Sequence, residues 1–453
     1  MNQTQPKNQK PEIKTAVPGP RSQALRQRED AHVAPGLQGY ALMAGIAVDQ
    51  ARGSTITDVD GNTFVDFIGG IAVNALGHSH PSYVKAVQDQ VARASVGALT
   101  SEARVELCER LATRTPPGLH RVQLYSSGAE AVESALRLCK CHTGKHEFVS
   151  FWGGFHGKTM GVLSLMGSRW KEKLGPMLPG SHIVPYADCY RCPLKLDYPG
   201  CSLACIDVAR KQVQMSSAGS IAGVIVEPMQ GTAGNVIPPK EFLPAVRDLA
   251  HEMGALFIAD EMITGMGRTG RHFGVNHSGV VPDIMTVGKA FGGGFPLSGI
   301  VTTDAIAVAK PWSHPSGSSS SYGGNPLAAA AGAAALKIID DERLVENSAQ
   351  VGAFMLGELG KMVERYPFVG FAQGAGLFLR LELVKDKASK QPLPRPVTER
   401  IFHECVRRGL LTMAYAPNFR LQPALTIDEA TARNGLEVLR EVFDLCERER
   451  WYA

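Results

Sequence analysis

Short apolar segments alternate with amphipathic segments along most of the chain, from about residue 81 to about residue 333. The apolar segments are six to eight residues long, as buried strands are, and the stretches between them repeat apolar residues at helical spacing. Strands that alternate with helices predict a mostly parallel sheet covered by helices on both faces. The predicted strands are 121–126, 147–152, 221–228, 255–260, 283–288 and 298–303, and the clearest helices are 81–94, 128–140 and 240–253.

The two ends of the chain follow other patterns. Residues 48–67 alternate on both sides of Asp60 and Gly61, a dipeptide typical of a tight turn, and so predict a β-hairpin. Residues 325–347 are rich in alanine and predict one long helix. The predicted organisation is a flexible, extended tail (1–35), an N-terminal segment that packs with the small domain (36–80), a large domain (81–334) and a C-terminal small α+β domain (335–453).

Composition and charge narrow the class of protein. The chain is 44% hydrophobic and 20% charged, as expected of a globular protein with a sizeable core. It has no apolar run as long as a membrane span, and its polar N-terminus lacks the apolar core of a signal peptide. The net charge of +4 comes largely from the first 30 residues, which hold six Lys/Arg and three Asp/Glu, so the rest lacks the basic stripe of nucleic-acid-binding proteins. We expect neither a membrane nor a nucleic-acid partner.

Cysteine usage indicates a compartment and raises the question of a metal. Nine cysteines are few and odd in number for 453 residues, which argues against a disulfide framework and predicts a reducing, cytoplasmic setting. Four of them form a C-x2-C pair followed by a C-x3-C pair, which resembles a structural zinc loop. The unusual second spacing and the short gap leave buried thiols in a compact loop as the alternative. These four are Cys189, Cys192, Cys201 and Cys205.

Three candidate features follow predicted strands, at the sheet edge where α/β proteins place their sites. Ser127 and Gly128 begin a helix whose first N–H groups could bind a phosphate, although an ordinary capped helix has the same sequence. Asp260 ends a buried strand, where an acid needs a partner. Lys289 ends another and precedes three glycines. A desolvated lysine becomes a nucleophilic amine, whereas a lysine that reaches solvent from a strand end is the simpler interpretation.

One cofactor uses all three features together. Pyridoxal phosphate (PLP) takes a Schiff-base lysine, a carboxylate on its pyridinium nitrogen and a phosphate site. The order and the 29-residue step from Asp260 to Lys289 resemble the class III, fold type I, PLP-dependent aminotransferases, in particular 4-aminobutyrate and ω-amino acid transaminases. The resemblance covers residues 35–445. It is carried by SSGAEAVESALRL, FHGKTMG, VEPMQG, IADEMITGMGRTG, PDIMTVGKAFGGGFP and SSYGGNPLAAAA.

The resemblance implies a fold and a set of residue roles. The fold is an α/β, fold type I PLP-transferase: a large domain with a mostly parallel seven-stranded sheet, plus a smaller α+β domain. Lys289 forms the aldimine with PLP and moves the substrate proton, and Asp260 keeps the ring nitrogen protonated. The assembly is a homodimer, or a tetramer, with active sites at the subunit interface. The other implied cofactor-binding residues are Ser127, Gly128, Ala129, Phe155 (stacked on the ring), His156, Glu227, Ile263 and Ser321 (on the phosphate of the neighbouring subunit).

Two positions depart from the pattern of many relatives and bear on the substrate. Thr232 replaces a glutamate that pairs with a C-terminal arginine in relatives that use 2-oxoglutarate, while that arginine is matched by Arg420. Ile263 replaces a common glutamine. With Ile71 lining the same pocket, these residues predict a substrate with an aliphatic body and a terminal amine, and an arginine that is available to a carboxylate.

The predicted activity is PLP-dependent transamination of an ω-amino acid or aliphatic primary amine, 4-aminobutyrate-like, by ping-pong exchange through pyridoxamine phosphate. The acceptor is a keto acid, pyruvate or 2-oxoglutarate. The nearest alternative is an amino acid or lactam racemase or epimerase of the same fold, because some of these also lack the glutamate–arginine pair. A non-catalytic binding protein is disfavoured by the joint presence of the lysine, the acid and the phosphate loop.

Overall fold

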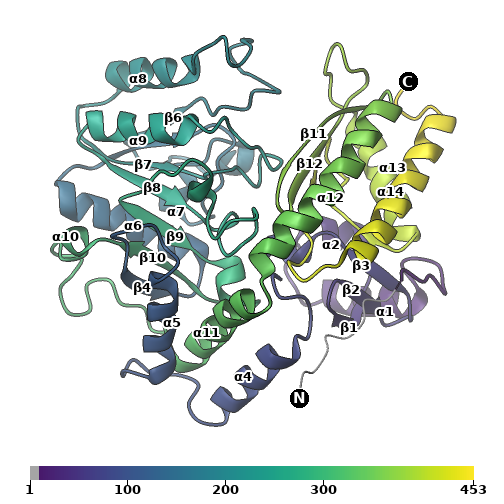
Figure 1. The fold of residues 1–453 in the computed structure, drawn as a ribbon, viewed down its shortest axis with the longest axis horizontal. Helices are drawn as coiled ribbons and strands as arrows, with labels where there is room; N and C mark the ends of the chain where they lie inside the picture. Colours follow the sequence, from purple (N-terminus) through teal and green to yellow (C-terminus); the bar gives the residue numbers. More distant parts are fainter. Residues whose placement is uncertain (1–9) are drawn as a thin grey trace. The chain divides into compact units, whose positions relative to one another are not determined.

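The computed structural model describes residues 10–453 and contains two compact units (Figure 1). One consists of the described residues up to Val84 together with Glu346–Ala453, and the other of Lys85–Val345. Residues 1–9 of the predicted tail lie outside the described part.

The Lys85–Val345 unit is built on a seven-stranded sheet in the order β4-β10-β9-β8-β7-β5-β6. β10 runs antiparallel to both of its neighbours, and the other adjacent pairs are parallel, so the predicted mostly parallel sheet is confirmed. The strand at the far edge, β6, was not predicted. The strands are β4 (Arg121–Tyr125), β5 (Glu147–Phe151), β6 (Ser181–Val184), β7 (Ile221–Val226), β8 (Leu256–Asp260), β9 (Ile284–Val287) and β10 (Ser298–Thr302).

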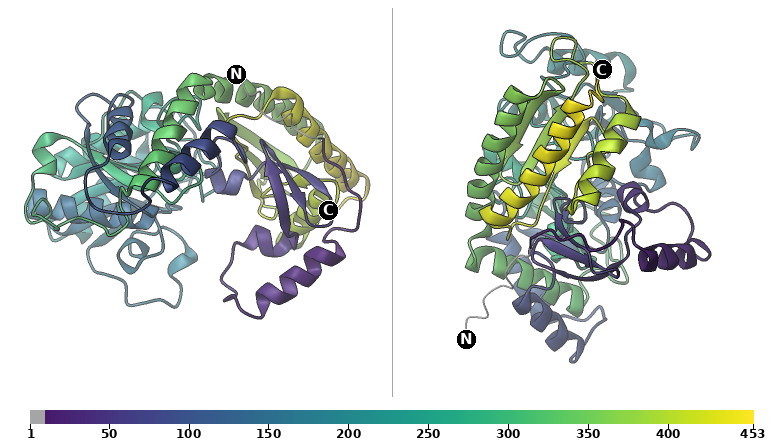
Figure 2. Two further views of the ribbon diagram at one scale, coloured as in Figure 1. Left: turned by 90° about the horizontal axis from the view of Figure 1, so that it is seen from below. Right: turned by 90° about the vertical axis from the view of Figure 1, so that its right-hand side faces the viewer.

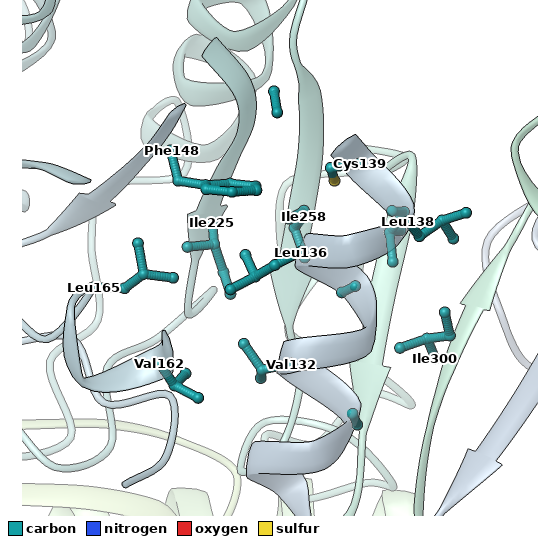
Figure 3. Packing of buried hydrophobic residues seen from close by; sticks show 14 of the residues in the cluster. Val132, Leu136, Leu138, Cys139, Phe148, Val162, Leu165, Ile225, Ile258 and Ile300 are labelled. Carbon is teal, nitrogen blue, oxygen red and sulfur yellow. The ribbon is translucent and has the colours of Figure 1, made fainter. Parts of the chain in front are cut away.

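Helices cover both faces of this sheet. Phe148 of β5 packs in the cluster formed with α6, whereas Phe151, three residues along the same strand, contacts Phe242 of α9. Residues an odd number of positions apart point to opposite faces of a strand, so α6 and α9 lie on opposite faces. Figure 3 shows the α6 side, where the apolar stripe of the helix faces the strands. That core includes Val132, Leu136, Cys139, Phe148, Val162, Leu165, Ile225, Ile258 and Ile300.

The predicted helices of this region are present, with shorter additional ones. Helices 128–140 and 240–253 correspond to α6 and α9, and helix 81–94 corresponds to α4. The helices from Pro81 to Asp341 are α4 (Pro81–Val91), α5 (Glu102–Ala112), α6 (Gly128–Thr143), α7 (Met160–Leu163), α8 (Ala204–Ser216), α9 (Phe242–Glu252), α10 (Asp304–Ala307) and α11 (Pro326–Asp341), with 3-10 turns η1 (Arg169–Lys171), η2 (Gly274–His277) and η3 (Lys289–Gly292).

The other unit contains two small sheets, β1-β2-β3-β13 and β11-β12-β14. The helices α12, α13 and α14, green to yellow in Figure 2, lie along the second sheet. The elements are α1 (Pro20–Asp30), α2 (Gly39–Ala44), β1 (Val48–Arg52), β2 (Thr55–Asp58), β3 (Thr63–Asp66), α3 (Gly69–Ala72), α12 (Leu344–Arg365), β11 (Val369–Ala375), β12 (Phe378–Leu383), α13 (Arg395–Arg407), β13 (Leu410–Leu411), β14 (Asn418–Leu421) and α14 (Glu429–Arg448).

Of three local elements predicted from the sequence, one is present and two differ in the structure. The hairpin at Asp60 and Gly61 is confirmed as β2–β3, and β1 adds a third strand. The extended tail is wrong over residues 20–30, which form α1, because the Asp60 carboxylate accepts the N–H groups of Arg21 (2.8 Å) and Ser22 (2.9 Å) in its first turn. The single helix over 325–347 is also wrong, because Arg343 adopts a left-handed conformation (φ 52°) between α11 and α12.

Candidate active site

The first part of the site is the N-terminus of α6, which follows β4. The Ser127 hydroxyl accepts the N–H of Glu130 (3.2 Å), and the Glu130 carboxylate accepts the N–H of Ser126 (3.1 Å). This reciprocal pair fixes the point at which the helix begins. The predicted phosphate residues Ser127, Gly128 and Ala129 therefore lie at a true helix N-terminus, where N–H groups and the helix dipole favour an anion.

Close glycine contacts bring separate strand ends to this helix. A Cβ added to Gly128 would lie 3.0 Å from the Met262 sulfur, and a Cβ on Gly288 would lie 2.5 Å from the same atom. A Cβ on Gly157 would lie 2.6 Å from the Cβ of Ala129. The segments after β4, β5, β8 and β9 thus converge on one place, and they approach as closely as they do because these positions are glycine.

Asp260, at the end of β8, is a buried carboxyl group that three polar groups contact. It is 2% exposed, and Thr286 Oγ1 (2.9 Å) and the N–H of Met262 (3.2 Å) both donate to its Oδ1. Its Oδ2 lies 2.7 Å from Nδ1 of the buried His156. Burial alone lowers the pKa of His156, but the hydrogen bond to Asp260 and its charge outweigh this and raise the pKa. Three polar partners therefore set the orientation of the carboxylate.

Lys289 follows β9, the strand next to β8, so it leaves the same edge of the sheet as Asp260. It begins η3 in a left-handed conformation (φ 48°), which is uncommon for a residue with a side chain. Such strain is typical of functional positions. The side chain is half-buried, less enclosed than a fully desolvated lysine would be.

Glu227 joins two loops beside Asp260. Its carboxylate oxygens accept the N–H of Phe155 (2.8 Å) and the N–H of Gly231 (2.9 Å). Burial raises the pKa of Glu227, while His156 and the two N–H groups oppose the rise. Phe155 is half-buried and makes an edge-on contact with Trp170, with ring centroids 6.0 Å apart. The loop that carries Phe155 is thus held by its backbone.

The walls around Gly231 are apolar on one side. Ile263 is 7% exposed, and its Cδ1 would lie 2.2 Å from a Cβ on Gly231. Thr232, the next residue, is half-buried. Ile263 therefore packs against the backbone of Gly231, and Gly231 is next to Thr232, which stands where many relatives have a glutamate.

A second buried acid, Glu261, holds the loop that follows β8. Its carboxylate accepts the Thr264 hydroxyl and the N–H groups of Gly274 (2.8 Å) and Val275 (2.8 Å). Burial outweighs these donors and raises the pKa of Glu261 from 4.5 to about 7. Glu261 therefore holds the loop between Thr264 and Val275, whereas the Asp260 carboxylate contacts His156 and Thr286.

The remaining predicted residues belong to three other segments of the chain. Ser321 is exposed in the loop before α11. Ile71 and Arg420 belong to the other unit, where the carbonyl of Phe67 accepts the N–H of Gln422 (2.8 Å), so the two segments that carry them are adjacent in backbone. Ile71 has φ 63°, a strained conformation for a β-branched residue, and Arg420 lies on β14 opposite Arg380.

The zinc interpretation of the four cysteines is not supported. They line one small hollow, and all are free thiols. Among residues 10–453, no group of three or more His, Cys, Asp or Glu side chains could hold a metal ion. Cys205 is buried in the first turn of α8, and Cys189 is exposed in the preceding loop. Within the same described range, no helix is both long and apolar enough to cross a membrane.

Three residues of the site were not predicted from the sequence. Thr286 binds Asp260, Met262 fills the space between two glycines, and the Gln230 side chain donates to the carbonyl of Trp152 (2.8 Å). Thr286 had a signal, since it is a polar residue inside a short apolar strand. Met262 and Gln230 had none beyond their place in quoted motifs.

The fold and the cluster of Lys289, Asp260 and the α6 N-terminus define a fold type I PLP-transferase. A family model described as Aminotransferase class-III matches residues 38–443, and the chain belongs to that family. It is therefore an aminotransferase. It is 34% identical over 435 residues to 5-aminovalerate aminotransferase DavT of Pseudomonas putida (93% of this chain, 98% of the relative).

Two further comparisons bear on the fold and on the alternative activity. A solved amine transaminase from an uncultivated Pseudomonas species, in the PLP-bound form, superposes with TM-score 0.84 at 32% identity and covers 91% of this chain and 98% of that one. A leucine/methionine racemase of Thermococcus litoralis is 31% identical over 412 residues (89% of this chain, 92% of the relative).

Proposed function

We propose that this aminotransferase moves the amino group of an ω-amino acid or aliphatic primary amine to a keto acid, pyruvate or 2-oxoglutarate. The observation that carries the proposal is the buried Asp260, held by three partners, on the strand next to the one that delivers Lys289. The relatives named as 5-aminovalerate and amine transaminases support this substrate class.

The residues fit PLP, which the family implies. The N-terminus of α6 would hold the phosphate through Gly128 and Ala129, and a Cβ at Gly128 would lie only 3.0 Å from the Met262 sulfur. Asp260 would keep a proton on the ring nitrogen, and Phe155 would cover one face of the ring. When bound, PLP supplies an electron sink for the bonds at the amine carbon. Ser127, Glu227 and Ile263 complete the proposed cofactor pocket.

The work of the chain is to bind, orient and move protons. The Lys289 Nζ would take the proton from the substrate carbon and return it to the cofactor side. His156 shares its Nδ1 with Asp260, so it would hold that carboxylate in place and would not act as a free acid. Because Asp260 is buried and oriented in advance, its charge would stabilise the cationic ring without reorganisation.

The apolar contact of Ile263 with Gly231, beside Thr232, supports a substrate with an aliphatic body. Ile71 would add apolar surface, and Arg420 would bind the far carboxylate of an ω-amino acid or that of the keto acid. An arginine suits this role because its planar fork matches a carboxylate with two hydrogen bonds.

A donor screen tests the proposal. The holoenzyme is given 4-aminobutyrate, 5-aminovalerate, β-alanine or a diamine, with pyruvate or 2-oxoglutarate, and the new amino acid is measured. We expect turnover with at least one donor, and a folded but inactive Lys289→Ala variant. Normal turnover by Lys289→Ala, or activity with α-amino acids alone, would contradict the proposal.

The racemase remains a second candidate because of the 31% identical leucine/methionine racemase. A racemase needs proton donors on both faces of the substrate carbon. The bond between His156 and Asp260 disfavours His156 as the second donor. The two activities separate in one experiment: L-alanine is incubated with holoenzyme and no keto acid, and formation of D-alanine would favour the racemase.

Two properties of the whole assembly are part of the proposal. We infer a homodimer, because Ser321 is exposed and the family resemblance assigns it to the phosphate of a neighbouring subunit. We also infer a reducing, cytoplasmic location from nine free cysteines. Light scattering and cell fractionation test these two points, and a monomer that is fully active would contradict the first.

A further inference from the structure

The VEPMQG stretch places two buried polar side chains, three residues apart, against one neighbouring loop. Glu227 is 6% exposed and Gln230 is 2% exposed, and both follow β7. The loop is 152–155, which follows β5 and ends at Phe155. β5 and β7 are adjacent parallel strands, so their outgoing loops lie side by side.

Both side chains bind backbone atoms of that loop, so these contacts do not depend on which side chains the loop carries. Glu227 accepts the N–H of Phe155 at 2.8 Å. Gln230 donates its amide N–H to the carbonyl of Trp152 at 2.8 Å, and its amide oxygen would lie 3.0 Å from a Cβ on Gly153. The loop is thus held at both ends, and Gly153, with φ 77°, leaves the space that the amide of Gln230 occupies.

The same two residues also fix the second loop. The other oxygen of Glu227 accepts the N–H of Gly231 at 2.9 Å, and the backbone of Gln230 exchanges two hydrogen bonds with Val236 (3.0 and 2.9 Å). The Tyr186 hydroxyl donates to the carbonyl of Glu227 (3.2 Å), which anchors the start of the stretch. Thr232 lies inside the turn closed in this way.

We propose that Glu227 and Gln230 are positioning residues, which act as a two-point clamp that sets the place of Phe155 over the cofactor ring and of Thr232 beside the substrate. The inference rests on the proposed function and deepens it, because it assigns one device to both cofactor binding and substrate binding. A carboxylate is required at residue 227 because it is the side chain that accepts two N–H groups with no donor of its own. A glutamine there would turn an NH2 group toward one of the two N–H donors.

The test uses two variants and two matched controls. Glu227→Gln and Gln230→Ala break the clamp. Glu147→Gln is the first control, since Glu147 is equally buried (6%) and accepts the N–H groups of Ala218 (3.1 Å) and Ser220 (3.3 Å), but at the opposite end of β5. Gln212→Ala is the second, since Gln212 donates to the carbonyl of Ile183 (3.0 Å).

The readouts are the dissociation constant of PLP, the visible circular dichroism of the bound cofactor, and KM against kcat for the amine donor. We expect Glu227→Gln to weaken PLP binding about tenfold, the loss of one charged hydrogen bond, and Gln230→Ala about threefold. Both should change the dichroism and raise KM more than they lower kcat. The controls should lower the thermal midpoint and leave all three readouts within twofold of wild type.

The outcomes separate the two claims. If wild-type protein fails to bind PLP, the proposed function falls and the clamp falls with it. If wild type binds PLP and both clamp variants behave like the controls, the clamp alone is overturned. If Glu227→Gln does not fold, Gln230→Ala against Gln212→Ala decides the matter by the same readouts.

Discussion

The hydroxyl of Thr286 offers a direct test of how Asp260 is held. Thr286 is fully buried in β9 and donates to Asp260 Oδ1 at 2.9 Å. Thr286→Val keeps the shape of the side chain and removes only that donor. Two partners of the carboxylate remain, the N–H of Met262 and the ring of His156.

The magnitude follows from the charge on the acceptor. A hydrogen bond to a charged group contributes about 1.5–3 kcal/mol, against about 0.5–1.5 kcal/mol for a neutral one. Thr302 supplies the neutral comparison, because it is a buried threonine on the adjacent strand β10 that donates to the carbonyl of Asp283 at 2.8 Å. For a domain of this size 1 kcal/mol shifts the thermal midpoint by roughly 2–4 °C. The expected falls are about 6 °C for Thr286→Val and about 3 °C for Thr302→Val.

The assay pairs thermal unfolding of the holoenzymes with titration of the apoenzymes by PLP. Thr286→Val should raise the PLP dissociation constant by up to about tenfold, since Asp260 loses part of its orientation, and Thr302→Val should leave it unchanged. If the two variants lose equal stability, the Thr286 hydroxyl does not donate to an ionised Asp260 carboxylate in solution. If Thr286→Val binds PLP as wild type does, Asp260 is not the group that holds the cofactor ring.

Three more predictions concern other parts of the site. Ser127→Ala should cost about 0.5–2 kcal/mol by removing the cap of α6, and should weaken binding of inorganic phosphate to the apoenzyme, which calorimetry measures. Ile71→Gly should be more stable than Ile71→Ala, because a left-handed backbone costs a residue with a side chain about 1–2 kcal/mol. Both variants should raise KM for aliphatic amines. The reverse order of melting points would show that the backbone at Ile71 is unstrained. The raised pKa of Glu261 means that the folded state keeps this proton to higher pH than the unfolded chain does. The stability that this proton contributes is therefore present below pH 4.5 and is lost as the pH rises to about 7. The loss amounts to about 2–3 kcal/mol between pH 5 and pH 8. Glu261→Gln should flatten the fall in thermal midpoint over that interval, and an unchanged pH profile would refute this assignment.

The sequence was most informative where local physics decides the outcome. The apolar strands of the large sheet and the stripe of α6 are set by side-chain periodicity, so they were predicted from single segments. β6 was missed because it has only four residues and the first two, Ser181 and His182, are polar, so it lacks the apolar run of the central strands. α1 was missed because its cap, Asp60, lies some forty residues away along the chain.

The same limit applies to the site. Lys289, Asp260 and the start of α6 were identified because each has a local signature and their order matches a family. The bond between His156 and Asp260 joins residues 104 positions apart, and the bond between Glu227 and Phe155 joins residues 72 apart. Such pairs depend on strand order, which single-segment patterns do not specify. The environment of each acid therefore had to come from the structure.

The place of β10 in the sheet bears on how the protein is made. β4, which leads into the proposed phosphate site at the start of α6, is an edge strand whose neighbour is β10, and Tyr125 pairs with Ser298 across that ladder. During synthesis α6 emerges from the ribosome long before residues 298–302 do. The Ser298 hydroxyl also donates to the carbonyl of Ser127, at 2.6 Å, so it secures the start of α6. A nascent chain therefore cannot complete its cofactor site until β10 has been translated, and pairings so distant in sequence are the slow ones in folding.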